Sequence, residues 1–128
     1  MNKEKRQLEL LLELLNEREQ IEDNIKALPV GYISVKQISG HTYYYRQWRE
    51  GSKIISEYVP EAFLNATRRK IAARKENEAL LKVVKKELKK AEHKVLKEGL
   101  LNEADIEELK EAAKNGADVV ALAQEKAK

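Results

Sequence analysis

Residues 29–60 read PVGYISVKQISGHTYYYRQWREGSKIISEYVP, and this stretch decides the fold. It is rich in Val, Ile, Tyr and Trp, which favour the pleated geometry of β-strands. Two breaks that contain glycine, Ser39-Gly40 and Glu50-Gly51, divide it into three runs of about eight residues, and glycine suits the tight turns of hairpins. The stretch therefore predicts a three-stranded antiparallel β-meander over residues 31–59.

Helical patterns flank this stretch on both sides. Apolar residues recur at heptad spacing up to Pro29, which ends the first pattern because the residue before a proline is pushed out of helical geometry. A second long pattern begins at Pro60 and ends at Gly99. Its heptad seam consists of Leu81, Val84, Leu88, Ala91 and Val95. We expect helices over residues 1–28 and 60–98 that pair as an antiparallel, coiled-coil-like hairpin.

Capping signals predict short helices over residues 102–128. Asn102 can accept the backbone N–H of Asp105 at the start of one helix, and Asp118 can cap another. Together these elements predict an α+β fold that forms a single domain over residues 1–128. The leucine-rich first helix could also form a homodimer, since a seam of this length suits either kind of pairing.

Composition and charge restrict the class of protein. The chain has 128 residues, no cysteine, and 25 basic against 22 acidic residues, for a formal net charge of +3. The lack of cysteine excludes disulfides, thiolate metal ligands and cysteine nucleophiles. No apolar run approaches the roughly 20 residues that span a bilayer, so we expect a cytoplasmic protein without a membrane partner.

The charge is distributed unevenly along the chain. Residues 31–98 carry 16 basic and 8 acidic groups, whereas the segments on either side are both acidic. A polyanion would therefore meet the middle of the chain, unless the two ends fold back and neutralise it.

The predicted meander has two chemically different faces. Two-residue loops at both breaks would pair Tyr44 with Val35 on one side and with Glu57 on the other, and alternation then assigns every strand residue to a face. The tryptophan face comprises Ile33, Val35, Tyr44, Trp48, Ile55 and Val59, with Arg46 and Lys53 near its rim. The tyrosine face comprises Tyr32, Tyr43, Tyr45 and Tyr58, with Ser34, Lys36, His41, Gln47, Arg49 and Ser56 between them. The first is a core face that can receive a helix, whereas the second mixes aromatic rings with basic groups.

The tyrosine face indicates nucleic-acid binding. Aromatic rings offer flat surfaces to bases or sugars, Lys and Arg neutralise phosphates, and a ribbon of strands fits the major groove of DNA. The predicted interface, to DNA in the first place, consists of Tyr43, Tyr45, Arg49, Tyr58, Lys36, His41, Arg68, Arg69, Lys70 and Arg74. Tyrosines also favour sheet surfaces for packing alone, and a helix could cover this face, so a structural or protein-binding role has equal weight.

Catalytic and metal-binding motifs are not found in the sequence. His41 and His93 are far apart and lie in different predicted elements. There is no Gly-rich phosphate loop, paired-histidine motif or recognisable nucleophile motif. The lysines within residues 82–97 lie mostly opposite the heptad seam, which is typical of a solvated helix face. We therefore expect a non-enzymatic protein that uses no cofactor and no metal.

The segment from Leu28 to Pro60 resembles a group of small uncharacterised prokaryotic proteins. They share an LPxG start, a tyrosine cluster before a WREG-like turn, and a lysine-rich third strand, over about a quarter of this chain. This resemblance implies the meander and no activity. The order of three strands followed by a helix also resembles the small arm-binding domains of tyrosine recombinases, which insert their sheet into the DNA major groove, although the flanking helices here are much longer.

Two hypotheses of different classes follow. The first is a small DNA-binding protein that uses the tyrosine face and the basic start of the long helix. The second is a non-enzymatic protein-interaction module, such as an inhibitor or accessory protein of a mobile element or phage that acts on a nucleic-acid-handling machine. Binding that weakens steeply with salt would favour the first, and a stable protein complex with weak salt dependence would favour the second.

Overall fold

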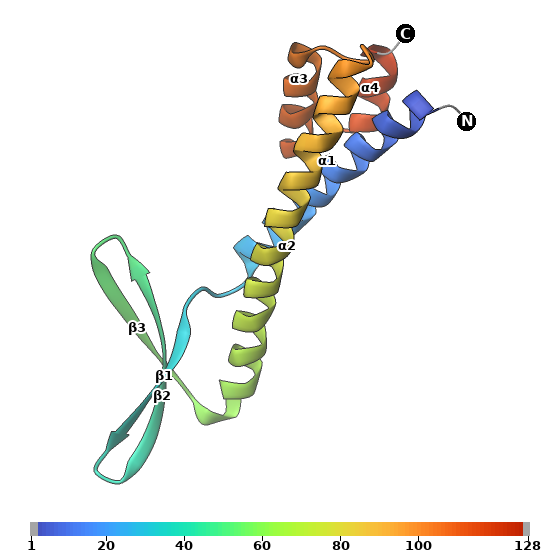
Figure 1. Cartoon of the computed structure of the whole chain (residues 1–128). Helices are drawn as coiled ribbons and strands as arrows, with labels where there is room; N and C mark the ends of the chain where they lie inside the picture. Colours follow the sequence, from blue (N-terminus) through green and yellow to red (C-terminus); the bar gives the residue numbers. More distant parts are fainter. Residues whose placement is uncertain (1–2, 127–128) are drawn as a thin grey trace. The chain divides into compact units, whose positions relative to one another are not determined.

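The computed structural model describes residues 3–126, and it confirms the α+β fold (Figure 1). The elements in chain order are α1 (Lys3–Ala27), β1 (Tyr32–Ile38), β2 (His41–Glu50), β3 (Lys53–Val59), the 3₁₀ turn η1 (Glu61–Phe63), α2 (Leu64–Lys97), α3 (Glu103–Lys114) and α4 (Val119–Lys126). Each helix and strand that the sequence predicts is present. The outermost residues of the predicted terminal helices lie outside the described residues.

Contacts divide the chain into two compact units. The sheet unit is Asn24–Glu78, and the helical unit combines Met1–Asp23 with Ala79–Lys128. The helices α1 and α2 are each divided between the two units, at Asp23/Asn24 in α1 and at Glu78/Ala79 in α2. The sheet unit holds 10 of the 25 basic residues and 5 of the 22 acidic ones, for a net charge of +5, which leaves −2 for the helical unit.

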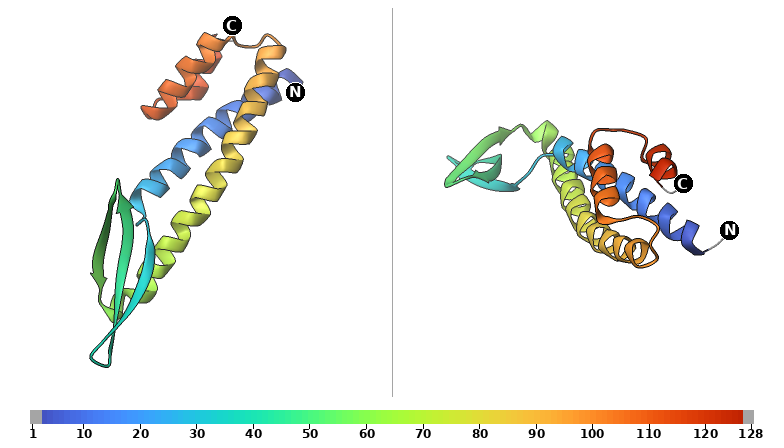
Figure 2. Two further views of the ribbon diagram at one scale, coloured as in Figure 1. Left: turned by 60° about the vertical axis from the view of Figure 1, so that its left-hand side comes forward. Right: turned by 90° about the horizontal axis from the view of Figure 1, so that it is seen from above.

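In the helical unit, α1 and α2 run antiparallel and side by side in both views of Figure 2. The seam positions predicted on α2 are buried with the exception of Leu81, which is half-buried. Leu11 and Leu15 of α1 have no exposed surface at all. The predicted hairpin is therefore confirmed. Because the seam leucines of α1 are buried within the same chain, few of them are exposed for a homodimer through this helix.

The two short helices complete the core of the helical unit. Asn102 and Asp105 form a reciprocal capping box at the start of α3, where the Asn102 side chain accepts the backbone N–H of Asp105 at 2.8 Å. Asp118 Oδ1 accepts the backbone N–H groups of Val120 and Ala121 at the start of α4. The buried core of the unit consists of Leu11, Leu12, Leu14, Leu15, Ile21, Val84, Leu88, Ala91, Val95, Leu101, Ile106, Leu109, Ala113, Val119 and Ala123.

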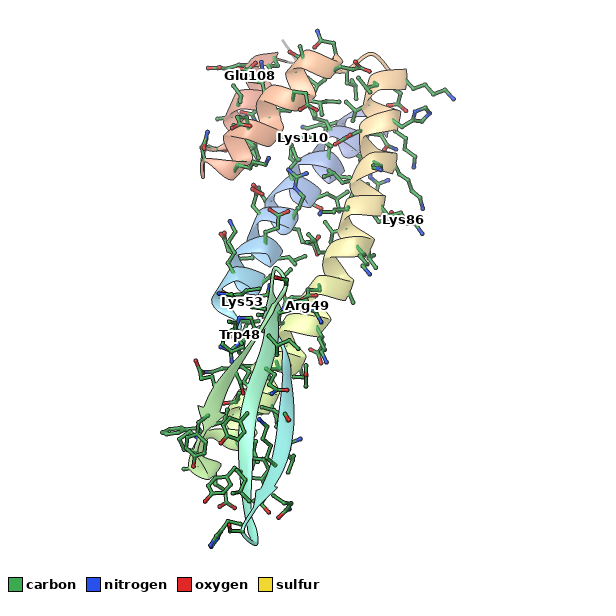
Figure 3. The ribbon with its side chains drawn as sticks, turned by 90° about the vertical axis from the view of Figure 1, so that its left-hand side faces the viewer. Trp48, Arg49, Lys53, Lys86, Glu108 and Lys110 are labelled. Carbon is green, nitrogen blue, oxygen red and sulfur yellow. The ribbon has the colours of Figure 1, made fainter. Side chains whose placement is uncertain are left out.

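An ion pair also joins α3 to α2 within this unit. Lys110 Nζ lies 2.8 Å from Glu92 Oε1 and 3.4 Å from Glu107 Oε1. Burial lowers the pKa of the Lys110 ammonium, but its hydrogen bonds to the two carboxylates and their charges outweigh this and raise the pKa above 10.5. Figure 3 shows Lys110 on the side of α3 that faces the other helices, whereas Lys86 points outward from α2.

The sheet has the order β1-β2-β3, and one of its two predicted registers needs a correction. Tyr44 pairs with Val35 as expected, but on the other side it pairs with Val59, not Glu57. The second loop is Gly51-Ser52, because the turn needs a residue with positive φ at its first central position and Gly51 supplies it with φ +61°. The strand therefore slips by two residues relative to the prediction. A slip of two keeps every side chain on its face, so the residues predicted for each face are confirmed. The expected core character of the tryptophan face is confirmed only at Val59, which is buried, whereas Val35 is 52% exposed.

The tryptophan face is the one that receives other elements of the sheet unit. Val59 on this face and Ile71 of α2 are buried. Arg46 and Glu57, also on this face, line an open groove together with Thr67 of α2 and the segment Lys26–Pro29. The tyrosine face keeps Tyr32 and Tyr58 each 54% exposed.

Candidate nucleic-acid interface

Aromatic rings form a continuous row on the tyrosine face. Tyr45 and Tyr58 are direct cross-strand partners with ring centroids 5.8 Å apart. Tyr43 lies 6.5 Å from Tyr58 on one side and 6.5 Å from His41 on the other. Edge-to-face and tilted rings at these distances stabilise one another and keep part of each ring surface open to solvent. Four of the predicted site residues thus form one surface.

Polar and basic groups continue this row across all three strands. The Tyr32 hydroxyl donates to Gln47 Oε1 at 3.0 Å, and Gln47 Nε2 donates to Ser56 Oγ at 3.4 Å. Lys36 Nζ lies 4.7 Å above the ring of Tyr45, close enough for a cation–π contact. These contacts hold the Gln47 amide and the Lys36 ammonium in place over the sheet.

The two faces differ completely in the placement of their carboxylates. Both glutamates of the strands, Glu50 and Glu57, project from the tryptophan face. There they have partners, since Trp48 Nε1 donates to Glu50 at 3.0 Å and Arg46 lies 3.7 Å from Glu57. The strand residues of the tyrosine face include Lys36 and Arg49 and no Asp or Glu.

Arg46 contacts three other residues, two on the tryptophan face and one in the segment that precedes β1. Its guanidinium stacks 3.8 Å from the ring centroid of Trp48 and donates to the Val30 carbonyl at 2.6 Å. The side chain is largely buried. These contacts attach the α1–β1 connection to the sheet, so Arg46 serves the fold and leaves the opposite face to other partners.

The basic residues at the start of α2 do not form one surface. Successive helix residues point about 100° apart, so the block Arg68–Lys70 spreads around the helix. Arg68 and Lys75 line an open groove with Tyr32, at the edge of the tyrosine face. Lys70 lies in the groove on the tryptophan side with Arg46, and Arg69 is exposed between these two directions.

Arg74 has structural partners that the sequence did not predict. Its Nη1 donates to the carbonyls of Ile25 and Leu28 at 2.8 Å each, and its Nε donates to Glu78 at 2.9 Å. Those carbonyls lie at the end of α1, where helix carbonyls lack intrahelical partners. We therefore assign Arg74 to capping α1 and do not retain it in the interface.

The structure also adds residues that the predicted set omitted. Tyr32, Gln47 and Lys75 lie on or beside the tyrosine face, and the alternation of the strands already assigns the first two to it. Nothing in the sequence indicates that Lys75, and not Lys70, accompanies the tyrosines, because that depends on how α2 meets β1.

Residues 3–126 offer little support for a metal centre or a membrane span. Within them, no group of three or more His, Asp or Glu side chains could hold a metal ion. His41 belongs to the sheet unit, and His93 is exposed in the helical unit. None of the described helices has both the length and the apolar character that crossing a membrane requires.

A family of unknown function matches the central part of the chain. Residues 11–70 match the model of a family described as "Domain of unknown function (DUF6788)". The match contains the whole meander, together with much of α1 and the first turns of α2. The resemblance to an uncharacterised family is thereby confirmed, and the description of the family assigns no activity. No curated protein and no solved structure matches the chain.

Proposed function

We propose that this protein binds nucleic acid through the tyrosine face, and that its ligand is duplex DNA entered from the major groove. The observation that supports this most is the segregation of charge on a three-stranded sheet. One face holds every strand carboxylate, each with a partner, and the other combines a row of tyrosines with Lys36 and Arg49. The two carboxylates of the first face offset its two cations, Arg46 and Lys53, whereas the strand residues of the second carry cations and no carboxylate, so the second attracts a polyanion more strongly.

Each group on the tyrosine face has a chemical role in this proposal. Tyr43, Tyr45 and Tyr58 contact bases or sugars with their rings and hydroxyls, and Arg49 donates to base edges. The Gln47 amide, oriented by Tyr32 and Ser56, is a further donor and acceptor for a base. Lys36 and His41 flank the row at the other end of the strands.

Phosphate contacts come from the edge of the same face. Arg68 and Lys75 lie beside Tyr32, where a DNA backbone along the groove edge would pass. Such contacts position the protein without reading sequence, and each one contributes about one unit to the dependence of log K on log salt.

The first test is a fluorescence-anisotropy titration with random-sequence duplex DNA, single-stranded DNA and RNA at two salt concentrations. We expect micromolar binding to duplex that weakens steeply with salt. Arg68→Gln should weaken binding and reduce the salt slope by about one unit, whereas Arg49→Gln and Tyr43→Ala should weaken binding with little change in slope.

Lys70→Gln is the matched control for these variants. It removes the same charge from the same unit, but Lys70 lies on the tryptophan side with Arg46 and Glu57. We expect its affinity to stay within about twofold of the unmodified protein. Equal losses for Lys70→Gln and Arg49→Gln would contradict the assignment to the tyrosine face. No binding to any of the three nucleic acids at low salt would reject the proposal and favour a protein partner.

A further inference from the structure

The strand β3 is a free edge of the sheet. The order β1-β2-β3 leaves it paired on one side only. At the opposite edge, β1 lies beside the first turns of α2 (Figure 2). There Tyr32 and Ile33 line a groove with Arg68 and Ile71. In the described part of the sheet unit, Figure 2 shows no helix or strand along the outer side of β3. A free edge presents backbone N–H and C=O groups to another strand.

The hairpin geometry decides which backbone groups are free. Glu50 and Lys53 flank the two-residue loop, and in such a hairpin the flanking pair exchanges both of its hydrogen bonds. Because the pattern alternates, Lys53, Ile55 and Glu57 bond inward to β2. Residues Ile54, Ser56 and Tyr58 therefore direct their N–H and C=O groups outward.

The outer edge of β3 is self-complementary. When two antiparallel copies of β3 are centred on Ile55, Ile54 of each lies opposite Ser56 of the other, so the outward groups of these residues are paired, while Tyr58 lies opposite Ser52 of the loop. In the same register, Lys53 of each copy lies opposite Glu57 of the other, which gives two ion pairs. The two Ile55 side chains lie opposite each other between these pairs. These three pairs are the non-hydrogen-bonded kind, whose Cα atoms are only about 4.5 Å apart, so their side chains interact most closely.

A register centred on Ser56 pairs the outward groups of Ile54, Ser56 and Tyr58, but its side-chain pairs are poorer. It places Lys53 opposite Val59, which is already buried against its own chain, and Ile55 opposite Glu57. It therefore loses both ion pairs. The order Lys53-x-Ile55-x-Glu57 thus favours the register centred on Ile55. The Glu57 side chain is 62% exposed, so it is accessible to Lys53 of a second copy.

We propose that the partner of this edge is a second copy of the same chain, in a two-fold symmetric dimer that joins two three-stranded sheets through β3. A two-fold axis at Ile55 repeats each contact, as symmetric dimers require. Residues that face each other across an antiparallel pair lie on the same face of the sheet. The two tyrosine faces consequently form one continuous surface. The association itself does not depend on nucleic acid and stands apart from the proposed function.

The charges allow a test by complementation. Lys53→Glu places glutamates opposite glutamates, and Glu57→Lys places lysines opposite lysines, so each variant repels its own copy. In an equimolar mixture, Glu at position 53 of one chain meets Lys at position 57 of the other, and Glu57 meets Lys53. Sedimentation velocity without nucleic acid, over about a hundredfold range of concentration, measures the dimer in each sample.

We expect the unmodified chain to dimerise, each variant to weaken dimerisation at least about tenfold, and the mixture to restore it, since two attractive pairs become repulsive and then attractive again. Lys36→Glu, on the opposite edge strand, is the control and should dimerise normally. Circular dichroism melts confirm that both variants are folded. A monomeric unmodified chain, or a dimer that Lys53→Glu leaves intact, would overturn the proposal, and so would two folded variants that stay monomeric when mixed.

Discussion

Gly31 is the residue whose identity the sheet unit tolerates least. Its φ is +113°, and a Cβ at this position would lie 2.1 Å from the Gln47 carbonyl oxygen. That oxygen belongs to β2 and cannot move without breaking the sheet. We expect Gly31→Ala to lower the free energy of unfolding by about 3 kcal/mol, from backbone strain and overpacking together. Urea titration followed by the fluorescence of Trp48, the only tryptophan, measures this change.

Gly40→Ala separates strain from steric overlap. Gly40 also has a positive φ, of +80°, but a Cβ there meets nothing within 4 Å. The strain of a left-handed residue alone costs about 1 kcal/mol. If both substitutions cost the same, the contact with Gln47 would contribute nothing, and Gly31 would be required for its conformation alone.

At the scale of elements, Arg74 joins the end of α1 to the start of α2 within the sheet unit. Its two hydrogen bonds to the carbonyls of Ile25 and Leu28 involve a charged donor, and such bonds stabilise by more than neutral ones. We expect Arg74→Met, which keeps most of the apolar stem, to lower the free energy of unfolding by about 2 kcal/mol. Arg69→Met, at an exposed position of the same helix, should change it by less than about 0.5 kcal/mol.

The same titration with Trp48 fluorescence compares the two arginine variants. Equal stabilities would show that water satisfies the α1 carbonyls as well as Arg74 does. Arg74 would then return to the set of basic residues available to a ligand.

The sequence predicts elements and strand faces better than it predicts contacts between elements. Periodicity of 3.6 and of 2 is local, so helices, strands and faces follow from neighbouring residues. The residues of each face are predicted correctly although the loop predicted at Glu50-Gly51 is wrong. The reason is that the error shifts β3 by two residues, and a shift of two leaves each side chain on the same face. The capping role of Arg74 could not be predicted, because its partners lie 46 and 49 residues away in sequence and leave no local pattern.

At the scale of the whole molecule, two basic surfaces lie in different units. The sheet unit carries a net charge of +5, and the lysines at positions 82, 86 and 89 form an exposed stripe on the part of α2 that belongs to the helical unit. Helical spacing places these three on one side of α2. Net charge alone therefore does not tell which surface a polyanion prefers; of these two basic surfaces, the one on the sheet unit has a row of tyrosine rings beside its cations.

Two triple variants of equal charge distinguish these surfaces. Lys36, Arg49 and Arg68 changed together to Gln, or Lys82, Lys86 and Lys89 changed together to Gln, both reduce the formal net charge from +3 to zero. We expect the first to lower duplex DNA affinity at least about a hundredfold and to reduce the salt slope by about two units, because it removes two phosphate-directed cations, Lys36 and Arg68, together with the base contact of Arg49. The second should change affinity less than about threefold, because it alters only the long-range field, which salt screens within about 10 Å. Anisotropy titrations at matched ionic strength compare them. Equal losses would mean that overall charge attracts the polyanion and that the tyrosine face has no special part, whereas a larger loss in the second variant would move the binding surface to the helical unit.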